Sequence, residues 1–307
     1  AMVPIQGEQM GEVHDAVTSS SGNGYDEEYT MKNLFAMPGA GVGDSQTKSV
    51  KSYETPLRTL IGEQVRSMAS TKSLSMDPDR FIEVLTESDI QIYWPYSDEW
   101  DGSSMPVVTF DPEDGAEMNK GYRLVVEDDG SRHVEEVLVD EAMAKEMPVW
   151  VINRNDDAGY TSLEMLRRED PDWGEGGGDI IVNPKSLALK RSVAGSKTLI
   201  LKDFIMKRNY DSWFAGASEF FVKVGAVEDF TASTEAELRL YSPSVTDFVI
   251  VVKRSQKGQP LPFNAVLVTD WSEQMTHCAF MITEDDGGTR TTWDCTALVR
   301  VASKSYG

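Results

Sequence analysis

The chain has 307 residues, and its 40% hydrophobic content is enough for one large core or two ordinary ones. Its net charge of −22 argues against nucleic acid as a partner, because proteins that bind nucleic acid carry clustered Lys and Arg. No apolar run approaches the roughly 20 residues of a membrane helix, so no transmembrane segment is predicted.

Residues 1–54 form a Ser/Gly-rich N-terminal segment with little hydrophobic periodicity. Its composition is typical of a flexible tether on a surface-anchored protein. The alternative is that this segment lies along the folded body or contributes an edge strand. The chain opens on Ala1 without a visible signal peptide, as the mature form of an exported protein or an expressed fragment would.

Two helices are predicted next. The first covers residues 55–70, with Thr55 as the N-cap and Pro56 as the first helical residue. Its apolar face would hold Leu57, Leu60, Ile61, Val65 and Met68. The second begins at Asp77 and Pro78 and would bury Phe81, Ile82 and Leu85.

Beyond residue 88 the sequence mostly predicts strands. Residues 89–96 alternate up to Pro95, residues 122–140 form a hairpin about Asp129 and Gly130, and residues 147–153 are typical of a buried strand. A helix at residues 161–170 closes this region. Further strands are expected at residues 197–207, 218–226, 236–241, 247–254, 263–271, 278–295 and 297–305. The sequence therefore predicts a mainly β protein with a few short helices, ending in a β-sandwich.

A step in charge predicts the domain boundary. Residues 81–186 carry 8 Lys and Arg against 26 Asp and Glu, a net −18, whereas residues 197–307 carry 12 against 14, a net −2. We therefore expect an acidic α+β domain at residues 55–186, a linker at 187–196 and a sandwich domain at 197–307.

The two cysteines, Cys278 and Cys295, flank a hairpin centred on Asp286 and Gly287, which suit a two-residue turn. In that register the cysteines face each other at a non-hydrogen-bonded pair, where Cα atoms approach to about 4.5 Å and a disulfide is feasible. The alternative is a reduced pair packed in the core. A disulfide is expected if the protein is exported.

Four blocks, "IQIYWPYSDEWDG", "MPVWVINRNDD", "YDSWFAGASEFFVKVG" and "EDDGGTRTTWDC", resemble segments of uncharacterised secreted or lipid-anchored proteins of Bacteroidetes bacteria. The resemblance implies export to the periplasm, the outer membrane surface or the medium, and a β-rich body. It carries no catalytic motif. The C-terminal region also resembles C2-type sandwiches, which often bind calcium through acidic loops.

No GxSxG, HExxH, GxGxxG or Walker motif is present. The three histidines, His14, His133 and His277, are best interpreted as packing or surface residues. Acidic loops suit calcium, which takes six to eight oxygen ligands, and the best candidates for a structural calcium site are Asp156, Asp157, Asp170 and Asp172. Ordinary turn chemistry is the alternative.

Aromatic residues cluster at Tyr93, Trp94, Tyr96 and Trp100, where they could stack on a sugar ring or a partner protein, or close the edge of a core. Tyr210, Trp213 and Phe214 have the same two interpretations. The leading hypothesis is a secreted or cell-surface binding or adhesion module whose partner is a protein or carbohydrate. The alternatives are a carbohydrate-active hydrolase with paired carboxylates and a purely structural envelope protein.

Overall fold

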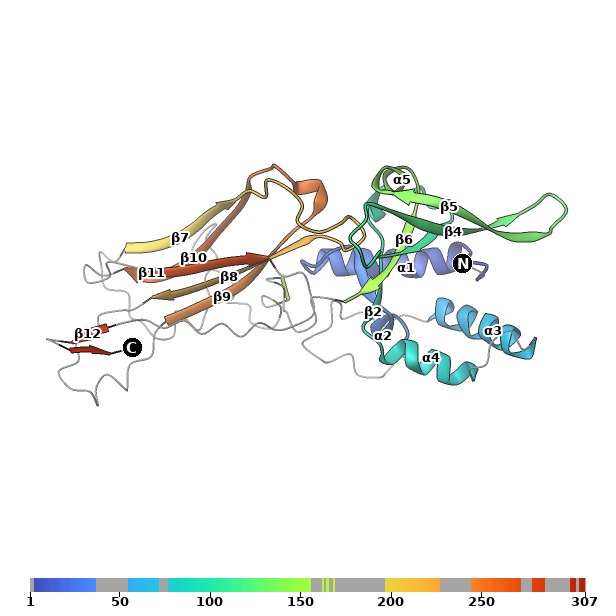
Figure 1. Ribbon diagram of the computed structural model, residues 1–307, viewed down its shortest axis with the longest axis horizontal. Coiled ribbons are helices and arrows are strands. Elements are labelled where there is room, and N and C mark those ends of the chain that lie inside the picture. Colours follow the sequence, from blue (N-terminus) through green and yellow to red (C-terminus); the bar gives the residue numbers. More distant parts are fainter. Residues whose placement is uncertain are drawn as a thin grey trace. The chain divides into compact units, whose positions relative to one another are not determined.

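The computed structural model describes residues 3–36, 55–71, 77–155, 162, 164–165, 168, 197–226, 244–271, 278–284, 299–301 and 304–306. The chain forms two compact units: unit 1 is Ala1–Tyr160 with Asn209–Ser218, and unit 2 is Thr161–Arg208 with Glu219–Gly307. Both are rich in strands, with a few short helices, which confirms the predicted fold class (Figure 1). The predicted linker at residues 187–196 lies outside the described residues, and the boundary near it stays a prediction.

Unit 1 is built on a six-stranded mixed sheet in the order β1-β2-β6-β3-β4-β5. Neighbouring strands are antiparallel except β3 and β6, which are parallel. The interior strand β6 carries the buried run predicted from its sequence. The strands span Glu28–Thr30 (β1), Ile90–Tyr93 (β2), Val107–Phe110 (β3), Met118–Val126 (β4), Arg132–Asp140 (β5) and Val149–Arg154 (β6).

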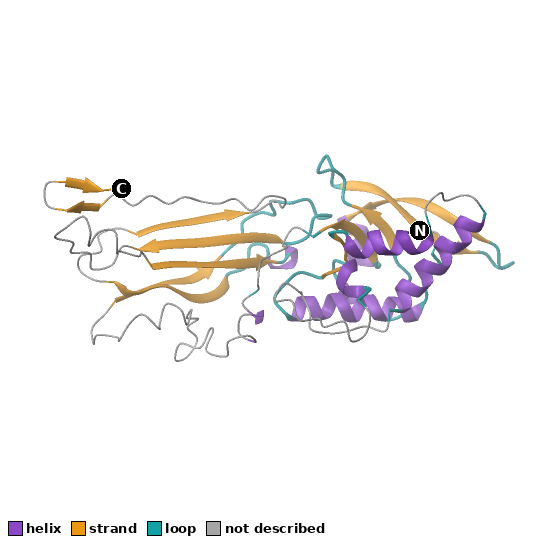
Figure 2. Ribbon diagram, turned by 90° about the horizontal axis from the view of Figure 1, so that it is seen from below, coloured by secondary structure: helices purple, strands orange, loops and turns teal. Residues whose placement is uncertain are grey.

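Helices cover one face of this sheet, as Figure 2 shows. They are α1 (Gly7–Gly22), α2 (Met31–Leu34), α3 (Pro56–Ser70) and α4 (Pro78–Glu87). Helix α1 and strand β1 lie in the segment whose composition suggested a tether, and β1 is an edge strand of the sheet. Met10, Val13 and Val17 on α1 are fully buried against Trp94 and Trp150, so this part of the segment belongs to the core.

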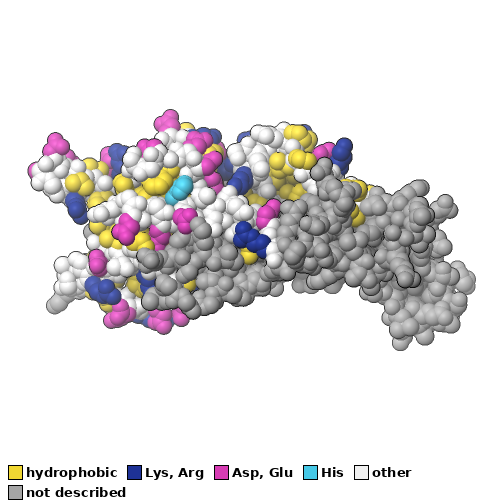
Figure 3. Space-filling model, turned by 180° about the vertical axis from the view of Figure 1, so that it is seen from behind, with side chains coloured by type: hydrophobic (Ala, Val, Ile, Leu, Met, Phe, Trp, Pro, Cys, Tyr) yellow, Lys and Arg dark blue, Asp and Glu magenta, His cyan; other side chains and the backbone are white. Residues whose placement is uncertain are grey.

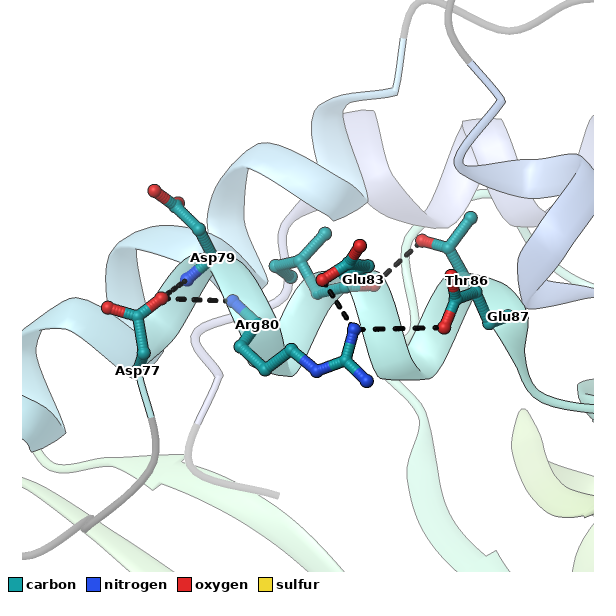
Figure 4. A network of polar contacts seen from close by, with 7 residues as sticks. Asp77, Asp79, Arg80, Glu83, Thr86 and Glu87 are labelled. Carbon is teal, nitrogen blue, oxygen red and sulfur yellow. Dashed lines mark hydrogen bonds and ion pairs between the residues drawn. The ribbon is translucent and has the colours of Figure 1, made fainter.

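Helices α3 and α4 begin where the sequence predicts, but their N-termini are capped differently. Asp77 caps α4 and accepts hydrogen bonds from the backbone N–H groups of Asp79 and Arg80, both at 3.1 Å (Figure 4). Along the same helix, Arg80 forms ion pairs with Glu83 at 2.6 Å and Glu87 at 3.9 Å.

Thr55 is the N-cap residue of α3, which confirms the prediction, but its side chain makes no capping hydrogen bond. Thr55 has left-handed backbone angles, with φ at 61°. Glu12 of α1 takes the capping role, because its carboxylate accepts a hydrogen bond from the N–H of Leu57.

The opposite face of the sheet is covered by α5 (Glu141–Glu146) and by Asn209–Ser218, which we call the plug. The plug connects strands of unit 2 yet packs within unit 1. Trp213 and Phe214 are fully buried there, against core residues of the sheet that include Tyr93, Val107 and Val151. Of the two interpretations of these aromatics, the structure shows core packing.

Polar contacts hold the plug in place. The N–H of Ala217 donates to Asp26 at 2.8 Å, and the indole N–H of Trp213 donates to the carbonyl of Glu117 at 3.0 Å. Gly216 has φ at 121°, and a Cβ atom there would lie 3.3 Å from the Asp26 carboxylate. A glycine is therefore required where the plug passes this side chain.

Unit 2 contains two sheets that share one core. The first pairs β10 (Leu261–Trp271) with β7 (Lys197–Phe204), and the second has the order β11-β8-β9, with β11 at Cys278–Glu284, β8 at Ser218–Ala226 and β9 at Ser244–Val252. Phe220, Val222 and Val252 from the second sheet pack with Leu199 and Leu267 from the first. The predicted likeness to C2 sandwiches stays a prediction. Strands β12 (Val299–Val301) and β13 (Lys304–Tyr306) pair with each other.

Candidate functional site

The aromatic block that the sequence singled out lies largely inside unit 1. Tyr93 and Trp94 are consecutive and point to opposite faces of the sheet, so that Tyr93 joins the core under the plug and Trp94 the core under the helices. They are 2% and 1% exposed, and neither presents a ring face to a ligand. Of the two interpretations given for these residues, ligand stacking or closing the edge of a core, the structure shows core packing.

Tyr96 and Trp100 are half-buried and line a small cavity of about 70 Å³. The hydroxyl of Tyr96 donates to Glu141 at 2.8 Å, and the indole N–H of Trp100 donates to the carbonyl of Ser104 at 3.0 Å. The cavity is well below the roughly 300 Å³ at which small-molecule sites begin. A stacking role for these two rings stays a prediction.

His14 has a packing role. Its ring lies 5.5 Å from that of Trp94 and 5.1 Å from that of Trp100, measured between centroids. Its Nε2 is 3.0 Å from the carbonyl oxygen of Ser97. This histidine belongs to helix α1 and the aromatic cluster rather than to a mobile tail.

A larger hollow of unit 1 is a groove of about 410 Å³, within the range of small-molecule sites. Residues 3–6, which precede α1, form one wall, and residues 104–106 and Met147 also line it. The floor is apolar and comes from strands β3 and β4: Val108, Tyr122, Leu124 and Val126.

The floor exists because the helices cover only part of the sheet. Val108 packs against the helix-side core, but the same face of β4 and β5 continues beyond the helices. We call this continuation the open face. Tyr122 stacks on Phe110 with ring centroids 6.4 Å apart, which places both rings on it. Its exposed apolar side chains are Phe110, Met118, Val126, Val134 and Leu138, between 38% and 61% exposed.

Hydrophobic side chains reach the surface of unit 1 in patches between charged ones on the side drawn in Figure 3. Scattered exposed apolar residues are normal in soluble proteins. The open face differs because its apolar residues share one side of adjacent strands, and one of them, Val126, lines the groove. Contiguous apolar surface of this kind marks binding sites.

An acidic turn holds Ser104, one of the residues that line the groove. Asp101 accepts hydrogen bonds from the backbone N–H groups of Ser103 and Ser104, both at 2.8 Å, and from the Ser104 hydroxyl at 2.7 Å. These bonds, chiefly the one from the Ser104 backbone, hold the pKa of Asp101 below its usual range. The turn therefore keeps its charge and its shape at neutral pH.

Two carboxylates of the described residues are deeply buried in unit 1, and one of them, Asp26, binds the plug. Asp26 and Glu28 are each 3% exposed, and Glu28 accepts a hydrogen bond from the side-chain amide of Gln91 at 2.6 Å. The bond from Ala217 to Asp26 anchors backbone of the plug, whereas the bond from Gln91 to Glu28 joins two buried side chains of neighbouring strands. Their role is structural, and their burial could not be read from the sequence.

Several residues singled out from the sequence lie outside the described residues. They include Asp156, Asp157, Asp170 and Asp172, so the calcium site stays a prediction. Cys295 is outside as well, whereas Cys278 begins β11, whose described partner is β8. Among the residues that the structure describes, no group of three or more metal-ligating side chains gathers, and no helix is long and apolar enough to cross a membrane.

Sequence reasoning missed the groove itself. Its floor alternates in sequence, with Tyr122, Leu124 and Val126 on one side of β4, and this pattern was interpreted only as a hairpin. Its wall comes from residues more than a hundred positions earlier. Comparison with protein-family models, with curated proteins and with solved structures finds no match to this chain.

Proposed function

We propose that this protein is a binding module without catalytic chemistry at its main site, and that the groove of unit 1 holds a small apolar ligand. The observation that carries the proposal is an apolar floor from β3 and β4, flanked by residues 3–6 and 104–106 in a hollow of about 410 Å³. Burial of apolar surface in such a hollow contributes about 25 cal/mol per Å².

The lining of the groove supports binding over glycoside hydrolysis. A hydrolase of the kind expected from the sequence needs two carboxylates facing the substrate. The residues that line the groove include no Asp or Glu. The groove thus has the character of a ligand site, which is mostly apolar with a few polar groups.

We further propose that the module acts outside the cytoplasm, in the periplasm, at the outer membrane surface or in the medium. The support is the resemblance of four sequence blocks to secreted or lipid-anchored proteins of Bacteroidetes bacteria. The disulfide between Cys278 and Cys295 belongs to the same proposal, because disulfides persist in oxidising compartments.

Titration with an uncharged apolar dye, N-phenyl-1-naphthylamine, tests the groove. We expect dye fluorescence to rise on binding to the wild-type protein and Val126→Asp to weaken this binding at least tenfold. Val126 is 60% exposed, so the variant should fold. Val84→Asp is the matched control, because Val84 is 42% exposed on α4 and does not line the groove. Equal dye binding by both variants would contradict the proposal.

A further inference from the structure

The groove carries an unbalanced positive charge. The chain has 51 acidic and 29 basic side chains, yet the groove is lined by Arg123 and Arg132 and by no acid. A lining opposite in sign to the whole protein indicates the charge of what it binds, since complementary charge favours one ligand class over another.

The two arginines differ in what they offer a ligand. Arg123 forms an ion pair with Glu135, the residue directly across the ladder, with 2.6 Å between Nε and Oε2. Tyr122 and Leu124, its neighbours along the strand, face the groove, so the Arg123 side chain points to the other side of the sheet. Its charge is therefore neutralised away from the groove.

Arg132 lies on the groove side. It pairs with Val126 in the ladder, and paired residues share a face, which places its side chain beside the exposed end of the groove floor. Arg132 makes no ion pair or side-chain hydrogen bond within the described part of the chain. The other charges on this part of the open face, Lys120 and Glu136, pair with each other at 2.8 Å.

We infer that the groove binds a soluble amphipathic carboxylate, with its apolar chain along Tyr122 and Leu124 and its anionic head at Arg132. The inference rests on the proposed function and adds the chemical class of the ligand. A guanidinium suits this role because its planar fork matches a carboxylate with two parallel hydrogen bonds.

A free molecule suits the groove better than a bilayer. The groove has a volume of about 410 Å³ and is flanked by residues 3–6, so it suits one small molecule better than the flat surface of a bilayer. We therefore assign the ligand to solution.

Isothermal titration with dodecanoate and with dodecanol, which has the same chain without the charge, tests the inference. In the wild-type protein we expect dodecanoate to bind at least tenfold more tightly than dodecanol. Arg132→Ala should remove this preference and leave dodecanol binding unchanged. The matched control is Lys32→Ala, because Lys32 is exposed on α2 and does not line the groove.

Other outcomes overturn the inference in separate ways. Equal affinities of the wild-type protein for dodecanoate and dodecanol would refute the preference for a carboxylate. The proposed apolar groove would still stand if the uncharged dye binds. Binding to phosphatidylglycerol vesicles that depends on Arg132, without binding of free dodecanoate, would assign the ligand to a membrane. If Lys32→Ala also lost the preference for dodecanoate, the preference would come from the net charge of the protein and not from Arg132.

Discussion

Glu12 of α1 accepts a hydrogen bond from the backbone N–H of Leu57 at the start of α3, with 2.8 Å between Oε2 and N. The side chain is 7% exposed. Burial raises the pKa of Glu12 from 4.5 to about 7, even though hydrogen bonds from the backbone of Leu57 and Thr55 lower it. The charge of the nearby Glu8 adds to the rise.

This shift predicts a loss of stability as pH rises from 4.5 to about 7. Because the folded-state pKa lies above the unfolded value, the contribution of Glu12 is fully present below pH 4.5 and is lost as pH rises through 7. The loss is at most about 3 kcal/mol in the free energy of unfolding, at 1.36 kcal/mol per pKa unit. Urea unfolding at pH 5 and pH 8.5 measures it, and Glu12→Gln should flatten the difference. Parallel pH profiles for the two proteins would refute this role of Glu12.

The plug predicts a large effect of one aromatic side chain. Trp213 is fully buried in unit 1, so Trp213→Ala should lower the free energy of unfolding by about 3 to 5 kcal/mol, as large-to-small core changes do. Tyr210 lies in the same segment but is 51% exposed, and Tyr210→Ala should cost far less. Urea unfolding followed by circular dichroism compares them. Similar costs for both would mean that the plug is not part of the core.

Replacement by alanine should change the stability of the protein in opposite directions at Gly121 and at Gly11. A Cβ atom at Gly121 on β4 would lie 2.7 Å from Cγ1 of Val107 and closer still to Cγ2 of Val139. Gly121→Ala should therefore destabilise the protein by about 1 to 3 kcal/mol through overpacking. Gly11 on α1 has nothing within 4 Å of such an atom, and Gly11→Ala should stabilise by about 0.5 to 1 kcal/mol. Thermal unfolding of the two variants measures both shifts, and the same sign in both would contradict the prediction.

The cysteines test the proposed compartment. If the protein is exported, mass spectrometry of unreduced peptides should find Cys278 joined to Cys295. In the chain-entropy model, a short loop of this kind contributes roughly 3 kcal/mol to the free energy of unfolding. Recovery of both cysteines as free thiols after purification under oxidising conditions would count against export.

Local patterns in the sequence were enough to predict several elements of unit 1. Asp77 and Pro78 mark the start of α4 because a cap and a following proline act within one turn. The hairpin of β4 and β5 follows from alternation on both sides of Gly130, whose φ is 80°. Helix α1 was missed, because its serine-rich end resembles a linker and its stability depends on burial against distant strands.

The candidate site was predictable only in its parts. The alternation of Tyr122, Leu124 and Val126 indicates a strand with one apolar side, but not whether helices cover that side. Whether α1 covers the apolar side of β4 depends on how the helix and the strand pack in three dimensions, which local sequence does not show. The opposite burial of Tyr93 and Trp94 follows from strand alternation, and it is why their adjacency in sequence gave no shared binding surface.

The position of the plug in the chain also sets the order in which unit 1 can be completed during synthesis. Trp213 bonds to Glu117, 96 residues earlier, and Ala217 to Asp26, 191 residues earlier. When residues 1–160 have left the ribosome, the chain still lacks Trp213 and Phe214, which fill the core on the plug side of the sheet. Contacts between residues so far apart in sequence form slowly. Unit 1 is therefore completed only after residues 209–218, which follow β7, have emerged, and its apolar face stays uncovered until Trp213 and Phe214 arrive.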